Sequence, residues 1–343
     1  MVTLYAAMRD RLRCYAGDDT EPGGTSHAST RLEGHRIECL AASRAAPDRV
    51  FVGTFEDGLY RTRGQATEPG EREFERLETE FASEAVTALA ISPHDPDVIY
   101  AGTEPSRVYR STDGGDTWTH LEGLTDLPSA GEWAFPPRPH THHVRWLEVD
   151  PFDPDRLYVG IEAGAFVLSP DGGETWRERP EGSRRDNHTL ATHDDREGRV
   201  YTAAGDGYAV SDDGGDSWRR PQDGLEHTYC WGLAVDPADP DAVIVSSASG
   251  ARTAHTAERA DTHVYRRLGD EPWARLEDRG LPTGEGVVRA VFETTGADGV
   301  VYALNNWGLF RSEDFGDSWV GIDTDWTAGL ETQAPRGLVA VSD

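Results

Sequence analysis

The sequence STDGGDTW at residues 111–118 recurs along the chain as SPDGGETW at 169–176, SDDGGDSW at 211–218 and SEDFGDSW at 312–319. A catalytic loop occurs once in a chain, whereas a recurring pattern is typical of a repeating fold. In each copy the Asp carboxylate is suited to accept hydrogen bonds from backbone N–H groups, the Gly to adopt positive φ, and the Trp to pack on a core. An EF-hand-like calcium loop is disfavoured because the bidentate Glu at the twelfth position is missing. We predict four structural hairpins with these Asp and Trp positions: Asp113, Trp118, Asp171, Trp176, Asp213, Trp218, Asp314 and Trp319.

A second pattern precedes these segments: a short apolar strand, a turn of Asp, Pro and Gly, and another strand, as in 88–103, 147–161 and 233–247. With a third strand and a fourth led by Trp, each unit has the four antiparallel strands of one β-propeller blade. One large side chain marks each second strand: Tyr5, Phe51, Tyr100, Tyr158, Tyr201, Ile244 and Tyr302. The seven markers predict an all-β fold, a single seven-bladed β-propeller over residues 1–343.

The two ends of the chain are expected to share blade one. Residues 1–34 begin with the pattern of a second strand, whereas PRGLVAVSD at 335–343 has the pattern of a first strand. We expect the C-terminal strand to become the innermost strand of blade one, which closes the ring and removes an exposed sheet edge.

The four repeated segments resemble the Asp-box (BNR) repeats of the sialidase-like superfamily and of related WD40/YVTN/BNR-like repeat proteins. Such repeats also occur in xyloglucanase-type glycosidases, sortilin-type receptors and photosystem II assembly factors. The resemblance covers essentially the whole chain and implies a propeller with the boxes at the blade periphery, away from the ligand site. It implies little about function, because a fold does not fix the chemistry that it carries.

The composition is strongly acidic: 62 Asp and Glu residues against 33 basic ones give a net charge of −29, and the chain has no lysine. This combination resembles the proteins of salt-in haloarchaea, whose surfaces are screened by multimolar salt. It argues against nucleic acid and anionic membranes as partners, and the missing lysine excludes Schiff-base and P-loop chemistry. Three scattered cysteines (Cys14, Cys39 and Cys230) and the absence of a signal-peptide pattern predict a cytoplasmic protein.

One rim of the propeller is expected to carry the function. The longest loops, at 123–143 and 247–264, both fall on this rim, and loops on a rigid frame commonly carry function. Positions thirteen residues before the markers should form a ring around the channel: Glu38, Thr87, Arg145, His188, Trp231 and Arg289. Because this ring is polar, charged and aromatic, we predict a binding site at the channel mouth.

The candidate residues are assigned by their chemistry. The catalytic candidates are Asp186, His188 and Glu162. The ligand-binding candidates are His142, His143, Arg145, Tyr229, Trp231, Arg289, Arg336 and Asn305. The cofactor left open is a divalent metal at the channel mouth, with His140, His142 and His188 as candidate ligands.

Each assignment has a structural alternative. Arg145 and Glu162 form either a buried ion pair or a clamp for a carboxylate or phosphate. His188 beside Asp186 is either an oriented general base or a hydrogen-bonded structural histidine. The ring of Trp231 either stacks on a sugar or fills the core.

Sialidases use an Arg triad, a Tyr–Glu nucleophile and an Asp acid, and they usually contain a (Phe/Tyr)-Arg-Ile-Pro motif. This motif does not occur in the chain. Xyloglucanase-type enzymes pair two propellers around a cleft, whereas one propeller is expected in this chain. We therefore predict a cytosolic, halophilic propeller that binds a small polar ligand, anionic or sugar-like. Its activity is left open between a hydrolase and a lyase. The alternative is a non-catalytic assembly-factor scaffold with a protein partner.

Overall fold

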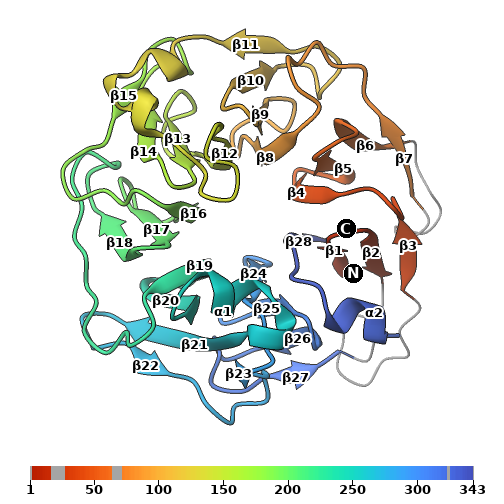
Figure 1. Cartoon of the computed structure of the whole chain (residues 1–343), viewed down its shortest axis with the longest axis vertical. Coiled ribbons are helices and arrows are strands. Elements are labelled where there is room, and N and C mark those ends of the chain that lie inside the picture. Colours follow the sequence, from red (N-terminus) through yellow and green to blue (C-terminus); the bar gives the residue numbers. More distant parts are fainter. Residues whose placement is uncertain (1, 17–27, 64–71, 323–324, 343) are drawn as a thin grey trace.

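The computed structural model describes residues 2–16, 28–63, 72–322 and 325–342 of the 343-residue chain. Its strands form seven antiparallel sheets that surround a central axis as blades (Figure 1). This confirms the predicted all-β, seven-bladed propeller.

Blades one to four each contain four strands, in order from the innermost outward. Blade one contains β28 (Gly337–Ser342), β1 (Val2–Ala7), β2 (Leu12–Ala16) and β3 (Ser29–Arg31). Blade two contains β4 (Ile37–Ser43), β5 (Ala46–Thr54), β6 (Leu59–Arg63) and β7 (Glu73–Arg76). Blade three contains β8 (Val86–Ile91), β9 (Ile99–Thr103), β10 (Val108–Ser111) and β11 (Thr119–Leu121). Blade four contains β12 (Val144–Val149), β13 (Leu157–Ile161), β14 (Ala165–Ser169) and β15 (Arg177–Glu178).

The remaining blades vary more. Blade five contains β16 (Asn187–Thr192), β17 (Val200–Ala204) and β18 (Gly207–Ser211). Blade six contains β19 (Tyr229–Asp236), β20 (Asp239–Ala248), β21 (Asp261–Leu268) and β22 (Ala274–Arg275), and β23 (Gly284–Glu285) also pairs with β21. Blade seven contains β24 (Val291–Thr294), β25 (Val301–Asn305), β26 (Gly308–Ser312) and β27 (Val320–Gly321).

Blade five departs from the predicted four strands. Its outer position is reduced to an isolated bridge between Val210 and Arg219. Pro221 follows two residues later, and a proline has no N–H to donate to a ladder. The outer strand therefore stops after one bridge.

Strand β28 closes the ring as expected. It pairs antiparallel with β1, in a register that runs from Val2 opposite Ser342 to Ala7 opposite Gly337. The C-terminal strand is thus the innermost strand of blade one, and Figure 1 shows the two chain ends side by side there.

Helices are few and short in the described residues. Two 3₁₀ helices, Leu124–Asp126 and Pro128–Glu132, lie in the 123–143 loop. Helix α1 (Ala251–His255) and a 3₁₀ turn at Ala257–Arg259 lie in the 247–264 loop, and α2 (Ala328–Glu331) precedes β28. None of the described helices is long and apolar enough to cross a membrane.

The apolar core lies between neighbouring blades. The second-strand markers are all buried, with exposed fractions of 0–1 %. Tyr5 of blade one, for example, packs in one cluster with Val50 and Val52 of blade two. Because burying one such side chain stabilises a fold by about 1.5–3 kcal/mol, these interfaces fix each blade against the next.

The four repeated segments form matching hairpin loops between the third and fourth strand positions. In the first, Asp113 Oδ1 accepts from the Ser111 hydroxyl and the Thr117 N–H at 2.8 and 2.9 Å, and Asp113 Oδ2 accepts from the Thr117 hydroxyl at 2.6 Å. The same bonds recur around Asp171, Asp213 and Asp314. Each carboxylate is therefore engaged by its own loop.

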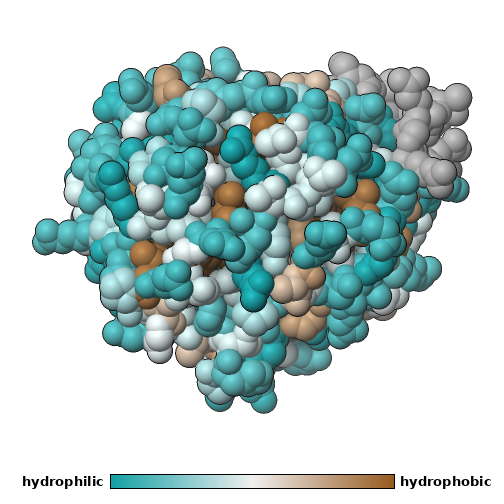
Figure 2. All heavy atoms as spheres, turned by 90° about the horizontal axis from the view of Figure 1, so that it is seen from above, coloured by the Kyte–Doolittle hydropathy of each residue, from teal (hydrophilic) through white to brown (hydrophobic). Residues whose placement is uncertain are grey.

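The side of the propeller seen in Figure 2 is mostly hydrophilic. Figure 2 shows one side of the propeller, where most of the surface is polar and apolar residues form small separate patches. Such scattered apolar residues are normal for a protein surface.

Candidate functional site

The innermost strands share a local irregularity that directs side chains into the channel mouth. In five blades the strand ladder skips residues near its start. The residues left out are Glu38, Thr87, Arg145 and His188, and Trp231 with Gly232 in blade six. A β-bulge leaves a residue unpaired and re-aims its side chain. The bulges therefore fall on the ring that the sequence predicted.

A cavity of about 1030 Å³ lies at this mouth. Its wall includes Glu38, Thr87, Arg145, Trp231, Arg289 and Arg336, together with His143, Glu162, Asp186 and Tyr229. Side chains from all seven blades or their flanking loops thus meet around one space. A cavity of this size accommodates a small organic ligand.

Three arginines share one part of the wall. The guanidinium carbons of Arg289 and Arg145 lie 4.0 and 4.9 Å from the centre of the Trp231 ring. Arg289 is only 1 % exposed, and neither of its terminal nitrogens has a hydrogen-bond partner. Burial, and then the charges of Arg336 and Arg145, lower the pKa of Arg289 well below its usual value. A buried, unpaired cation beside like charges is costly, and a bound anion would relieve that cost.

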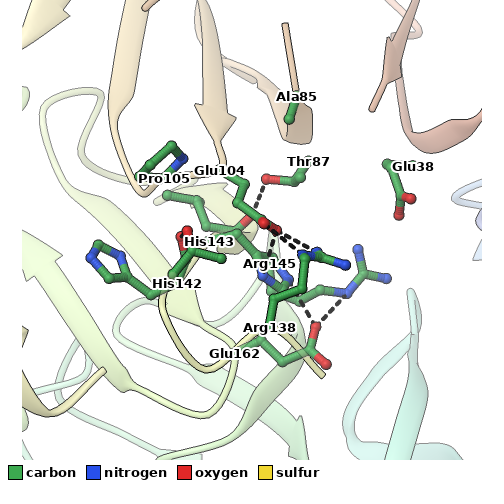
Figure 3. A network of polar contacts seen from close by, with 12 residues as sticks. Glu38, Ala85, Thr87, Glu104, Pro105, Arg138, His142, His143, Arg145 and Glu162 are labelled. Atoms are coloured by element: carbon green, nitrogen blue, oxygen red, sulfur yellow. Dashed lines mark hydrogen bonds and ion pairs between the residues drawn. The ribbon is translucent and has the colours of Figure 1, made fainter. Parts of the chain in front are cut away.

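Glu162 belongs to a polar network that joins blades three and four (Figure 3). Its Oε2 is 2.9 Å from His143 Nε2 and 3.8 Å from Arg145 Nε. His143 Nδ1 lies 3.5 Å from Glu104, which accepts two bonds from Arg138 at 2.7 and 2.5 Å. Burial raises the pKa of Glu162, but the hydrogen bond from His143 and the nearby positive charges outweigh it and hold this pKa well below the usual range.

Asp186 and His188 lie next to this network, in blade five. His188 Nδ1 is 2.7 Å from the Cys230 carbonyl oxygen, and its ring stacks on Trp231 with centroids 4.1 Å apart. Its Nε2 is 3.7 Å from Asp186 Oδ1, beyond hydrogen-bond distance. Asp186 Oδ1 instead accepts from the Ala163 N–H at 2.7 Å. Burial lowers the pKa of His188 and raises that of Asp186.

A series of hydrogen bonds links Arg289 to His255 and Tyr229. Arg289 Nε donates to His255 Nδ1 at 2.9 Å, and His255 Nε2 lies 3.0 Å from the Tyr229 hydroxyl. Burial and the Arg289 charge lower the pKa of His255 well below its usual value. Because Nδ1 accepts from Arg289, the imidazole carries its proton on Nε2. Trp231 is 4 % exposed and contacts His188 as well as two guanidinium groups, so its ring supports these groups.

Most predicted site residues meet at the cavity, but four do not line it. These four are His140, His142, His188 and Asn305. His140 is exposed, and His142 packs edge-on against Trp133 and points away from Arg145 and Glu162 in Figure 3. The predicted metal grouping of His140, His142 and His188 is therefore not formed.

Asn305 and His188 were predicted to contact a ligand, but neither lines the cavity. Asn305 Oδ1 accepts from the Trp307 N–H at 2.7 Å, and its amide donates to the Pro282 carbonyl, so Asn305 holds a loop in place. His188 is fully buried behind Asp186 and Trp231. Its Nε2 therefore faces Asp186 Oδ1, 3.7 Å away, rather than the open cavity.

Arg138 and Phe55 also line the cavity, although no sequence pattern marked them as site residues. The Arg138 guanidinium lies over the Phe55 ring, 4.8 Å from its centre, and forms an ion pair with Glu104. The signal available for Arg138 was its place within the 123–143 loop.

The channel beyond the mouth is lined mainly by apolar side chains. A second cavity of about 310 Å³ is lined largely by apolar residues, together with Glu148 and Glu293. Burial raises the pKa of Glu148 to about 7 and that of Glu293 to about 8. Both carboxyl groups therefore release their protons at a higher pH than an ordinary glutamate does.

The fold and the cavity define a seven-bladed β-propeller with an arginine-rich, polar channel mouth. No family model matches the chain. Over 290 residues it is 25 % identical to the xyloglucanase Xgh74A of Acetivibrio thermocellus, which covers 71 % of this chain and 33 % of that protein. The chain thus spans about a third of the length of this curated relative.

Solved structures show the same fold. The GH74 xyloglucanase of Xanthomonas campestris matches with a TM-score of 0.64 at 17 % identity, covering 93 % of this chain and 54 % of that one. A structure of YCF48 bound to a D1 peptide matches with a TM-score of 0.57 at 13 % identity, covering 90 % of this chain and 94 % of that one. At these identities the likeness is one of fold.

Proposed function

We propose that the channel mouth binds a small anionic, sugar-like ligand through Arg289, Arg336 and Arg145. The observation that carries this proposal is the state of Arg289: it is buried, it lacks partners for both terminal nitrogens, and it lies among like charges. Guanidinium groups bind carboxylates and phosphates through paired N–H donors. Three arginines gather on this wall of a chain with a net charge of −29. Arg336 pairs with Glu38 at 3.3 Å and Arg145 lies 3.8 Å from Glu162, so Arg289 is the arginine whose terminal nitrogens favour an added anion.

The proposed activity is that of a hydrolase or lyase acting on this ligand. Glu162 and Asp186 place two carboxyl groups on the cavity wall, in the same space as the arginines. Glycoside hydrolysis uses a pair of carboxyl groups on either side of the bond that is cleaved. The xyloglucanase relative supports a hydrolase in this role. Sialidase activity is not proposed, because the chain lacks the Arg-Ile-Pro motif of those enzymes.

Calorimetry with glucuronate, galacturonate and inorganic phosphate, and with glucose as the neutral control, tests the binding step. We expect the acidic ligands to bind and glucose not to bind. Arg336→Met should weaken binding at least tenfold. Arg177→Met is the matched control, because Arg177 lies on the outermost strand β15 with a side chain that is 58 % exposed. Equal binding by both variants would refute the site. Absence of binding with every ligand would favour the non-catalytic scaffold with a protein partner.

We further propose that the protein works in concentrated salt inside the cell. Its charge of −29 and lack of lysine support this, because salt at about 1 M shortens the Debye length to about 3 Å and suppresses repulsion between surface carboxylates. Thermal unfolding followed by circular dichroism should show a higher melting temperature in multimolar KCl than at low salt. A melting temperature that is independent of KCl would contradict this proposal.

A further inference from the structure

Three potential metal ligands lie together at the inner wall of the cavity. They are Glu162, after β13, Asp186, before β16, and His188, within β16. One ligand atom of each lies within 4.8 Å of the others. Glu162 and Asp186 line the cavity, so the cluster is reached from the channel mouth.

His188 presents an unused lone pair to this cluster. Its Nδ1 lies 2.7 Å from the Cys230 carbonyl oxygen, which only accepts, so Nδ1 carries the proton. In the neutral imidazole Nε2 is then an acceptor. This Nε2 is buried and has no hydrogen-bond partner, and Asp186 Oδ1 lies 3.7 Å from it. Three electron-pair donors thus lie within 4.8 Å of one another, and no donor hydrogen is directed at Nε2 by its described neighbours.

A second Asp-x-His sequence in the same chain shows the contrast. Asp261 and His263 are separated like Asp186 and His188, and His263 Nε2 lies 3.1 Å from Asp261 Oδ1. There the Arg275 guanidinium faces the same Nε2 at 3.5 Å. A positive group is therefore already present beside His263, whereas the Nε2 of His188 has none within hydrogen-bond distance among its described neighbours.

The hydrogen bonds of the cluster do not engage all of its carboxylate oxygens. His143 and Arg145 both approach Oε2 of Glu162, which leaves Oε1 available. A Cβ at Gly205 would collide with the Asp186 carboxylate, so the glycine allows the carboxylate to lie against the backbone. Ligands at about 2.1 Å from one ion are about 3–3.4 Å apart, so binding would draw the three groups together by roughly an ångström.

We propose that Glu162, Asp186 and His188 bind one divalent transition-metal ion, of the Mn²⁺ or Zn²⁺ class. One imidazole and two carboxylates suit these ions, whereas Mg²⁺ and Ca²⁺ prefer oxygen ligands alone. The site does not depend on the anionic ligand, and it is tested without one. With the ion bound, Glu162 and Asp186 are metal ligands in place of the free carboxyl pair proposed above for hydrolysis.

Mn²⁺ binding to the chelator-treated full chain tests the proposal. Electron paramagnetic resonance, in KCl concentrated enough to screen the acidic surface, reports the free ion. We expect one tight Mn²⁺ per chain, with an electron spin echo modulation from an imidazole ¹⁴N that surface carboxylates cannot produce. Zn²⁺ should displace it, and Mg²⁺ in equal amount should not.

Two variants and a matched control locate the ion. Asp186→Asn and Glu162→Gln should each weaken Mn²⁺ binding at least tenfold and remove or reduce the ¹⁴N modulation. Asp261→Asn, at the second Asp-x-His sequence, should leave both unchanged. The proposal is overturned by stoichiometric binding without ¹⁴N modulation, by absence of binding to the wild-type chain, or by unchanged binding in both cluster variants. Because no sugar or phosphate is present, a negative result leaves the arginine site standing.

Discussion

The repeated hairpin loops and the channel mouth differ in how far their polar side chains are satisfied by hydrogen bonds within the protein. In the loops, four copies of one sequence satisfy their carboxylates internally, as around Asp213, whose oxygens accept from Ser211 and Ser217. At the mouth, ring positions differ from blade to blade, and Arg289 and His188 keep buried nitrogens without partners. In the loops, where the sequence repeats, the polar groups stabilise the fold. At the ring positions, where the sequence does not repeat, some polar groups remain available to a ligand.

The largest expected effect is at Arg289. Arg289→Met should lower the affinity for an acidic ligand about 100-fold or more, because charged hydrogen bonds contribute about 1.5–3 kcal/mol each. The free energy of unfolding of the ligand-free protein should stay the same or rise, since a buried like charge is removed. Calorimetry and chemical denaturation measure the two quantities. A destabilised variant with full affinity would assign Arg289 to folding instead.

The apolar half of the channel gives a pH-dependent contrast with the mouth. The pKa of Glu293 is raised to about 8, so the folded state keeps a proton that the unfolded state releases above its ordinary pKa of about 4.3. Stability therefore falls as pH rises from about 4 to about 8. Glu293→Gln should stabilise the protein by about 2 kcal/mol above pH 8 and have little effect near pH 4. This is less than the full shift implies, because the side chain is partly exposed in the channel.

Denaturation curves at pH 4, 6 and 8 check this prediction. The same gain at all three pH values would show that packing, and not a proton, explains the effect.

A smaller effect is expected in the loops. Asp213→Ala should lower the free energy of unfolding at neutral pH by about 1 kcal/mol, by analogy with the loss of a capping residue. Burial raises the pKa of Asp213, but hydrogen bonds to Ser217 and Ser211 outweigh it, so the pKa is lowered overall. The cost should therefore disappear as the pH falls through that lowered pKa. Acid and urea titrations measure it, and ligand affinity should not change.

The smallest predicted difference lies among the loops themselves. Trp218 Nε1 donates to the Gly215 carbonyl at 2.9 Å, whereas Trp319 Nε1 is buried with no partner. Trp218→Phe should therefore cost about 1 kcal/mol more than Trp319→Phe. Equal costs in parallel denaturation experiments would mean that the tryptophans act through ring packing alone.

Much of the fold was readable from repetition. The second-strand markers are buried between blades, and the C-terminal strand completes blade one as its pattern indicated. The fourth strand of blade five was over-predicted, because Pro221 ends it after one bridge. Counting back from the markers also located the ring, since equivalent positions on equivalent strands repeat in space.

The site was harder to predict because side-chain direction is not periodic in loops. The 123–143 loop contains three nearby histidines, but only His143 faces the cavity, while His142 packs on Trp133. Asn305 was expected at the ligand and instead hydrogen-bonds its own loop. Arg138 has no sequence feature that distinguishes it from other charged loop residues.

The sequence by itself determined the seven blades, the hairpin loops, the closing strand and the level at which the ring lies, because these follow from local patterns that repeat. Only the tertiary structure decided which side chains leave the ladder at a bulge, that the terminal nitrogens of Arg289 have no partner beside Trp231, and that Glu162, Asp186 and His188 meet. These features depend on contacts between blades that are distant in sequence, and their energies are set by burial and by the charges that burial brings together.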